Sequence, residues 1–257
     1  MVRKPVIFSL IILLGGFFLF SSISFAEEEK IDLRVFDEDL NMKFELDLVP
    51  DDFSGTIRFQ VGNFQEDTER EIVVSYGNIA KPELVVYDFA GKELRRWQPY
   101  VPGFTGEISL AIADFDGDGR LEAAVVVTPH IGGTLKFFEL RKNRLRLEWL
   151  GEEWSAPGFS NHAMGSPIQT MAVAVDWGQA WGKGQVLHLP NARRTGLRQV
   201  FFKDGGYRIR DLARHERHIV TALFAADLDE DGWKEVVYGL GNGELVILRR
   251  SPAPKSQ

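Results

Sequence analysis

The chain has 257 residues and a formal net charge of −7, and it contains no cysteine. The acidic balance argues against nucleic acid as the main partner. The absence of cysteine excludes a disulfide framework and a redox Cys pair. No nucleophile elbow, zincin helix or phosphate loop occurs either, so the sequence carries no motif of a familiar enzyme class.

The N-terminus is typical of a secretory signal peptide covering residues 1–26. Arg3 and Lys4 precede an apolar run over residues 5–20, and small residues lead to an expected cleavage point after Ala26. The apolar run is shorter than the ~20 residues of a spanning helix, which favours cleavage over a membrane anchor. Cleavage leaves 231 residues with a formal net charge of −9, enough for one domain, and implies a periplasmic or extracellular location without a membrane span.

Strand-like segments at residues 31–36 and 42–48 come next, and the most informative stretch is an acidic loop at residues 114–122. It reads D-x-D-x-D-G-x-x-E between apolar runs, and the pattern recurs at residues 227–235. Carboxylates this close repel one another unless a hard cation gathers them, which favours calcium over magnesium. The expected carboxylate ligands are Asp114, Asp116, Asp118 and Glu122 in the first loop, and Asp227, Asp229, Asp231 and Glu235 in the second.

A main-chain carbonyl that follows the loop glycine should complete each metal site. Arg120 is expected to supply it in the first loop and Lys234 in the second. An EF-hand would need an acid at position twelve and flanking helices, but that position holds Val125 or Tyr238 and the surrounding residues favour strands. An acidic surface turn without metal is the alternative interpretation, and two matched copies make it the weaker one.

The loop belongs to a unit that occurs four times. Degenerate copies begin at Asn63 and Asp176, so the four starts are separated by 51, 62 and 51 residues. Each unit predicts one strand entering the loop, one leaving it and a hairpin, which is typical of a β-propeller blade. Trp97 and Trp149 occupy matching places in the last strand and should pack between units. Because the fourth unit lacks its last strand, an N-terminal segment is expected to supply it and close the ring.

The two acidic loops, in register with a four-strand repeat, resemble the FG-GAP/VCBS repeats of integrin-α-like β-propellers. The resemblance covers most of residues 57–250. The repeats predict an all-β fold over residues 27–250, a small β-propeller of about four four-stranded blades with five as the runner-up, followed by a disordered tail at 251–257. Propellers of this family usually have more blades than four. The resemblance implies two bound Ca²⁺ ions, with little or no binding at the degenerate copies.

In such a propeller the acidic loops lie on one face, and the blade-to-blade connections lie on the other. That opposite face would be locally basic on an acidic protein. The ligand-binding residues expected there are His130, Asn161, His162, Arg193, Arg194, His215 and His218. Two interpretations stay open: a site for an anionic ligand or a second metal using His130, His162 and His218, or side chains that cap loop carbonyls.

Three functions are consistent with these patterns. The favoured one is a non-catalytic, calcium-binding exported propeller that binds a protein or glycan at the basic face. A propeller hydrolase or lyase acting there through His162 and His218 is the alternative, and the proximity of Ser160 to His162 supports it only weakly. A structural envelope component without a small ligand is the third.

Overall fold

A computed structural model of the chain describes residues 10–13, 23–24, 32–36, 41–47, 53, 55–62, 70–77, 79–98, 103, 105, 110–127, 132–143, 146–161, 171–178 and 182–250. Every regular element in these ranges is a β-strand, which confirms the predicted all-β class. Within the same ranges, no helix has the length and hydropathy needed to cross a membrane. The tail at 251–257, residues 63–69 of the first degenerate loop, His130 and His162 lie outside the described residues.

The described strands form five sheets. The N-terminal sheet, of order β1-β3-β4, contains β1 (Leu10–Leu13), β3 (Asp32–Phe36) and β4 (Met42–Asp47). Sheet I, of order β2-β5-β6-β7-β8, contains β2 (Ile23–Ser24), β5 (Thr56–Gly62), β6 (Glu71–Gly77), β7 (Glu83–Asp88) and β8 (Glu93–Trp97).

The next two sheets have four strands each and the last has three. Sheet II contains β9 (Leu110–Ala113), β10 (Glu122–Val127), β11 (Thr134–Asn143) and β12 (Arg146–Pro157). Sheet III contains β13 (Val173–Val175), β14 (Lys183–Pro190), β15 (Gly196–Lys203) and β16 (Gly206–Arg214). Sheet IV contains β17 (Phe224–Ala226), β18 (Glu235–Gly239) and β19 (Leu245–Leu248). Consecutive strands within each of these sheets pair antiparallel.

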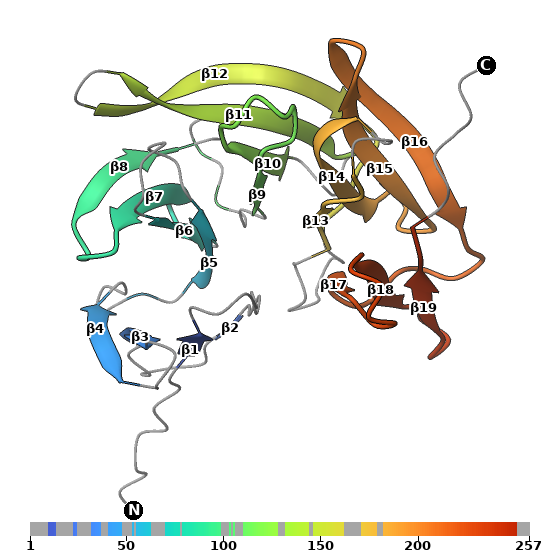
Figure 1. Cartoon of the computed structure of the whole chain (residues 1–257), viewed down its shortest axis with the longest axis horizontal. Coiled ribbons are helices and arrows are strands. Elements are labelled where there is room, and N and C mark those ends of the chain that lie inside the picture. Colours follow the sequence, from blue (N-terminus) through green and yellow to red (C-terminus); the bar gives the residue numbers. More distant parts are fainter. Residues whose placement is uncertain are drawn as a thin grey trace, which may run out of the picture.

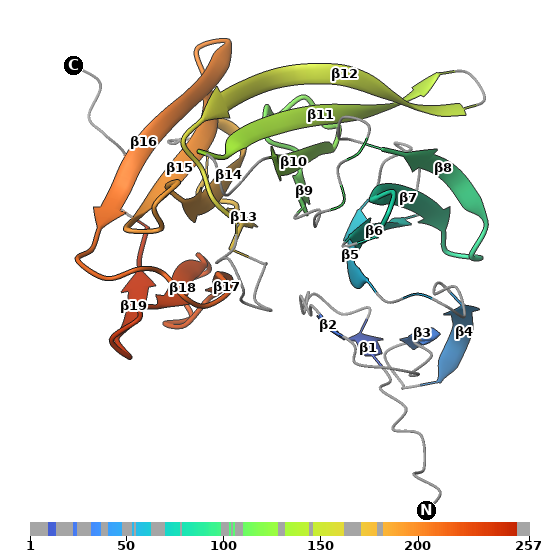
Figure 2. The same ribbon diagram turned by 180° about the vertical axis from the view of Figure 1, so that it is seen from behind.

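The sheets follow one another along an arc (Figures 1 and 2). The first strands β5, β9, β13 and β17 lie on the inside of the arc, and β8, β12 and β16 lie on the outside. The N-terminal sheet and sheet IV occupy the two ends of the arc in both views. The strands thus occur where the sequence units predict them, with the acidic loops joining β9 to β10 and β17 to β18.

The apolar runs of sheet II form strands because this sheet is buried on both faces. Along β10, Ala123 and Val125 pack toward sheet I, whereas Ala124 and Val126 pack toward sheet III. Alternate residues of a strand point to opposite faces, so a strand packed on both sides must be apolar throughout.

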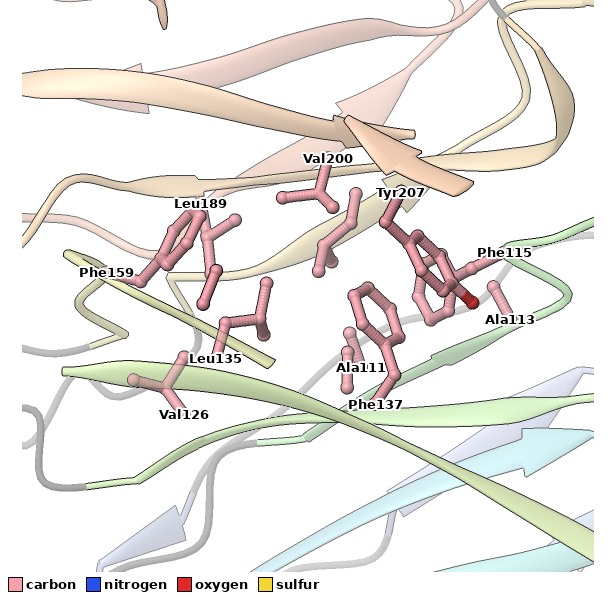
Figure 3. Packing of buried hydrophobic residues seen from close by; sticks show 13 residues of the cluster. Ala111, Ala113, Phe115, Val126, Leu135, Phe137, Phe159, Leu189, Val200 and Tyr207 are labelled. Atoms are coloured by element: carbon pink, nitrogen blue, oxygen red, sulfur yellow. The ribbon is translucent and has the colours of Figure 1, made fainter. Parts of the chain in front are cut away.

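Aromatic rings fill the space between neighbouring sheets. Phe137 of β11 stacks on Tyr207 of β16 with ring centroids 4.5 Å apart, and Phe115 meets Phe137 edge-on at 4.9 Å (Figure 3). Trp97 of β8 packs against Phe138 of β11 at 4.7 Å, which confirms its predicted place between units.

The prediction that an N-terminal strand completes the last sheet and closes the ring was wrong. β3 and β4 pair with each other, β1 pairs with β3 in parallel, and sheet IV contains no N-terminal strand. β1 and β2 both fall within residues 1–26, the predicted signal peptide. Pairing partners of a spare strand are set by long-range contacts that its own sequence does not encode.

Candidate functional site

The first acidic loop brings its four predicted carboxylates together. Asp114, Asp116, Asp118 and Glu122 each place an oxygen within 4.8 Å of the others. Glu122 is the buried member, and its Oε2 accepts a hydrogen bond from the amide of Phe115 at 2.7 Å. This bond orients the closing carboxylate, and the backbone of Glu122 is held as the first residue of β10.

The second loop has the corresponding hydrogen bonds. The amide of Leu228 donates to Oε2 of Glu235 at 2.8 Å. The amide of Gly232 donates to Oδ2 of Asp227 at 2.9 Å, as the amide of Gly119 does to Asp114 at 3.0 Å. Gly119 and Gly232 have φ values of 92° and 88°, so both turns need the left-handed conformation that glycine allows. The two loops therefore have the same local structure at the first aspartate, the residue after it, the glycine and the closing glutamate.

One predicted carboxylate of the second loop does not join its cluster. Oxygens of Asp227, Asp229 and Glu235 converge, but Asp231 is not among them. The main-chain carbonyl of Lys234 accepts a hydrogen bond from Nε1 of Trp177 at 3.0 Å. The prediction of Lys234 as the main-chain ligand was wrong by one position. Arg120 directly follows the glycine of the first loop, and the residue that directly follows Gly232 in the second loop is Trp233.

The first loop holds strong negative charge in a partly buried place. Burial raises the pKa of Asp116, and the nearby carboxylates of Asp118 and Asp114 add to this, although a backbone hydrogen bond lowers it. The Arg120 guanidinium offsets part of the charge, with Nη1 2.8 Å from Oδ2 of Asp118 and 3.4 Å from Oε1 of Glu139. A divalent cation would relieve the remaining repulsion.

The degenerate loop of sheet III contacts both acidic loops. On one side, the amide of Gln185 donates to the carbonyl of Asp114 at 2.7 Å. On the other side, Trp177 is fully buried and donates to Lys234, and the ring of Trp233 lies against Gly178. The acidic loops therefore brace neighbouring sheets, and the degenerate loop is shaped for contact with them.

The glycines at this contact are needed for close backbone approach. A Cβ on Gly184, whose φ is 72°, would lie 2.5 Å from the carbonyl oxygen of Asp114. We expect Gly184→Ala to lower the free energy of unfolding by more than about 2 kcal/mol, since both strain and a backbone clash oppose it. The control is Gly243→Ala, which has a φ of 88° but no atom within 4 Å of the new Cβ. Chemical denaturation of both variants separates the clash from the strain, and an equal loss would contradict the brace.

The acidic loops share their face of the molecule with the β15–β16 hairpin, as predicted. An open groove beside the first loop is lined by residues of three segments: Gly117, Gly182, Lys183, Gly184, Phe202, Lys203, Asp204 and Gly205. First-to-second loops and third-to-fourth hairpins therefore meet on this side.

The connections on the opposite face are joined by backbone hydrogen bonds. The amide of Ala192 donates to the carbonyl of Gly158 at 2.9 Å between sheets II and III. The amide of Gly241 donates to the carbonyl of His218, also at 2.9 Å, between sheets III and IV. Isolated bridges at Phe159↔Asn191 and Ile219↔Leu240 accompany these bonds. The same contact thus recurs at two successive sheet junctions and gives this face a rigid frame.

The predicted ligand-binding residues on this face have different environments. Asn161 is buried, and its carbonyl accepts a hydrogen bond from Met171 at 3.1 Å. Nη1 of Arg194 donates to the carbonyl of Ile219 at 3.3 Å, which is the capping role of the second interpretation. Arg193 is exposed.

The two histidines that the structure describes on this face also differ. Nε2 of His215 lies 2.7 Å from the hydroxyl of Tyr238. Burial lowers the pKa of His215, and Glu244 partly opposes this. His218 has an exposed side chain.

Two residues with structural roles were missed by sequence reasoning. Arg198 donates from Nη1 to the carbonyl of Gly158 at 3.0 Å and from Nε to Asp211 at 2.9 Å, and its guanidinium lies over the ring of Phe159. Trp177 stands at the second position of the degenerate loop, where the acidic loops carry Phe115 and Leu228. The sequence could have predicted the packing role of Trp177, because the aligned position is apolar in all three loops. The sequence contained no comparable signal for Arg198.

The sequence matches no family model, and no curated protein matches it at a significant level.

Proposed function

We propose that the protein is an exported, calcium-binding β-propeller that acts as a non-catalytic binding module. The observation that carries this proposal is the pair of acidic loops, which share the D-x-D-x-D-G-x-x-E pattern, the same amide-to-carboxylate hydrogen bonds and converging oxygens. The arc of sheets with their first strands inside agrees with propeller blades of the FG-GAP/VCBS kind.

Calcium is the cation that fits these loops best. All side-chain donors are carboxylate oxygens, and soft or nitrogen ligands are absent from both clusters among the described residues. Ca²⁺ accepts irregular shells of six to eight oxygens, whereas Mg²⁺ requires a near-ideal octahedron. Loops that combine buried Glu122 or Glu235 with half-buried or exposed aspartates suit the more tolerant ion.

Binding of a partner is assigned to the face opposite the acidic loops. The recurring hydrogen bonds between sheets hold its connections in place, and rigidly held loops favour recognition. Arg193 and His218 project exposed basic side chains there on a chain of net negative charge. A protein or glycan with acidic groups is the partner that this chemistry favours, and the signal peptide would deliver the module to the periplasm or beyond.

Titration calorimetry of the purified chain with CaCl₂ tests the metal assignment. We expect a stoichiometry of two and weaker binding of MgCl₂. Glu122→Gln should reduce the stoichiometry to one, because it removes the charge of the buried closing ligand. Asp204→Asn, in the exposed β15–β16 turn, is the matched control and should leave two sites. Heat of binding that persists unchanged in Glu122→Gln would exclude the first loop as a site.

A further inference from the structure

The two acidic loops differ in how many carboxylates they gather. In the first loop the oxygens of all four predicted acids converge, whereas in the second loop the converging group is Asp227, Asp229 and Glu235. The aspartates of the first group are half-buried apart from Asp118, and those of the second group are exposed. Calcium loops tune their affinity through the number of charged ligands and the rigidity of the site. The first loop therefore attracts a cation more strongly.

The residue opposite the closing glutamate adds to this difference. In sheet II, strand register pairs Glu122 of β10 with Glu139 of β11. Glu139 is buried, and its Oε1 lies 3.4 Å from Nη1 of Arg120, which also contacts Asp118. Burial raises the pKa of Asp116, and the charge of Glu139 contributes in the same direction. Glu139 thus places a further negative charge beside the first loop.

Sheet IV carries a positive charge at the corresponding place. The pairing of Val236 with Leu248 in β18 and β19, extended by one residue, sets Arg249 opposite Glu235. Nη2 of Arg249 lies 3.4 Å from Oδ2 of Asp229, which is one of the converging carboxylates. This guanidinium repels a cation that approaches the second loop.

The arginine of the first loop does not cancel the contrast. Arg120 is shared between Asp118 and Glu139, so sheet II supplies an additional carboxylate that offsets its charge. Arg249 instead neutralises Asp229, a carboxylate that the second site needs for the ion. The electrostatic difference between the loops is therefore greatest at the positions of Glu139 and Arg249.

The packing around the two loops acts in the same direction. Phe115 of the first loop is 1 % exposed, and the amide of Gln185 donates to the carbonyl of Asp114 at 2.7 Å. Sheet IV lies at one end of the arc (Figures 1 and 2), and Leu228, which matches Phe115, is 53 % exposed. The first loop is enclosed between sheets, whereas the second has more freedom to change shape. A more rigid calcium loop binds its ion more tightly.

We propose that the two loops bind Ca²⁺ with unequal affinity, and that the residue opposite the closing glutamate sets much of the difference. This inference rests on the calcium binding stated under the proposed function. Glu139 strengthens the first site, and Arg249 weakens the second. The first loop then keeps its ion as a structural brace, while the second loop fills and empties as the calcium concentration changes.

Titration calorimetry with CaCl₂ on single-site chains tests this proposal. Glu122→Gln leaves the second site and Glu235→Gln leaves the first, so each Kd is measured by itself. We expect the first site to bind about tenfold more tightly than the second. Arg249→Glu, added to Glu122→Gln, should lower the Kd of the second site about tenfold at low ionic strength, because a positive charge beside a divalent ion becomes a negative one.

Arg217→Glu in the same Glu122→Gln background is the matched control. Arg217 is exposed in the connection from β16 to β17, on the face opposite the acidic loops. Its substitution changes the net charge by the same amount as Arg249→Glu does. The Kd of the second site should stay within about twofold of its starting value, because solvent and salt screen a distant charge.

The first site is tested by Glu139→Gln in the Glu235→Gln background. We expect its Kd to rise about fivefold, because a negative charge beside the ion is lost. The glutamine oxygen can still accept a hydrogen bond from Arg120. Since Glu139 is buried, thermal unfolding in chelator checks that this variant is folded. The measurement on Arg249, an exposed residue, decides the proposal if the Glu139 variant does not fold.

Two results would overturn the proposal while leaving calcium binding intact. One is equal Kd values for the two single-site chains. The other is an Arg249→Glu chain that binds CaCl₂ no more tightly than its Arg217→Glu control. Absence of any heat of binding in the natural chain and in every variant would instead overturn the calcium assignment itself, and the proposal with it.

Discussion

Substitution of Phe115 by alanine is expected to lower the free energy of unfolding by about 3–5 kcal/mol. Phe115 is 1 % exposed and packs against Phe137 between sheets II and III. Its removal leaves a cavity that two rigid sheets cannot fill. Denaturant unfolding of the chain gives the difference, provided the slope of the transition is unchanged.

Leu228→Ala is the matched control for that substitution. Leu228 occupies the same position of the second loop but is 53 % exposed. In the chain that retains residues 1–26, we expect its substitution to cost less than about 0.5 kcal/mol. Equal losses for the two variants would contradict the difference in packing between the two loops.

Acid should destabilise the protein through His188. This histidine is fully buried, lies against the ring of Trp177, and has Nε2 3.1 Å from Nε2 of Gln199. Burial lowers the pKa of His188 to about 3, whereas an unfolded histidine titrates near 6.5. Its contribution to stability is therefore complete above pH 6.5 and is lost as the pH falls toward 3. Between pH 7 and pH 5 the loss is about 2 kcal/mol, since each pH unit costs about 1.4 kcal/mol.

His188→Gln isolates this effect, because glutamine keeps an acceptor for Gln199 and does not titrate. Urea unfolding at pH 7 and pH 5 should show the loss in the natural chain and a loss smaller by about 2 kcal/mol in the variant. The raised pKa of Asp116 acts in the opposite direction, stabilising the fold at lower pH, so it cannot imitate the effect. An unchanged pH dependence in His188→Gln would show that His188 is not buried in its neutral form.

The sequence could predict the strands and the acidic loops because both depend on local patterns. Apolar runs such as Glu122–Val127 are strands buried on two faces, and the carboxylate spacing of 114–122 needs only one tight turn to converge. Trp97 was also predictable, since matching places in a repeat share their neighbours.

Long-range choices were beyond the sequence. The pairing of β3 with β1 and the burial of Asn161 depend on segments far away in the chain. Arg194 illustrates the same limit, since a basic residue in a loop can bind a ligand or cap a carbonyl, and only the position of Ile219 decides between them. Asp231 keeps the loop pattern but lies outside the converging group.

Thermal unfolding in excess calcium and in chelator tests the central claim most directly. If both acidic loops bind Ca²⁺ in the folded state only, a concentration of 100 times Kd stabilises the protein by about 2.7 kcal/mol per site. For a domain of this size, two occupied sites should raise the Tm by about 10–20 °C. The Glu122→Gln/Glu235→Gln double variant should lose that rise. An identical Tm for the natural chain in calcium and in chelator would contradict the account, and the acidic loops would then be solvated turns.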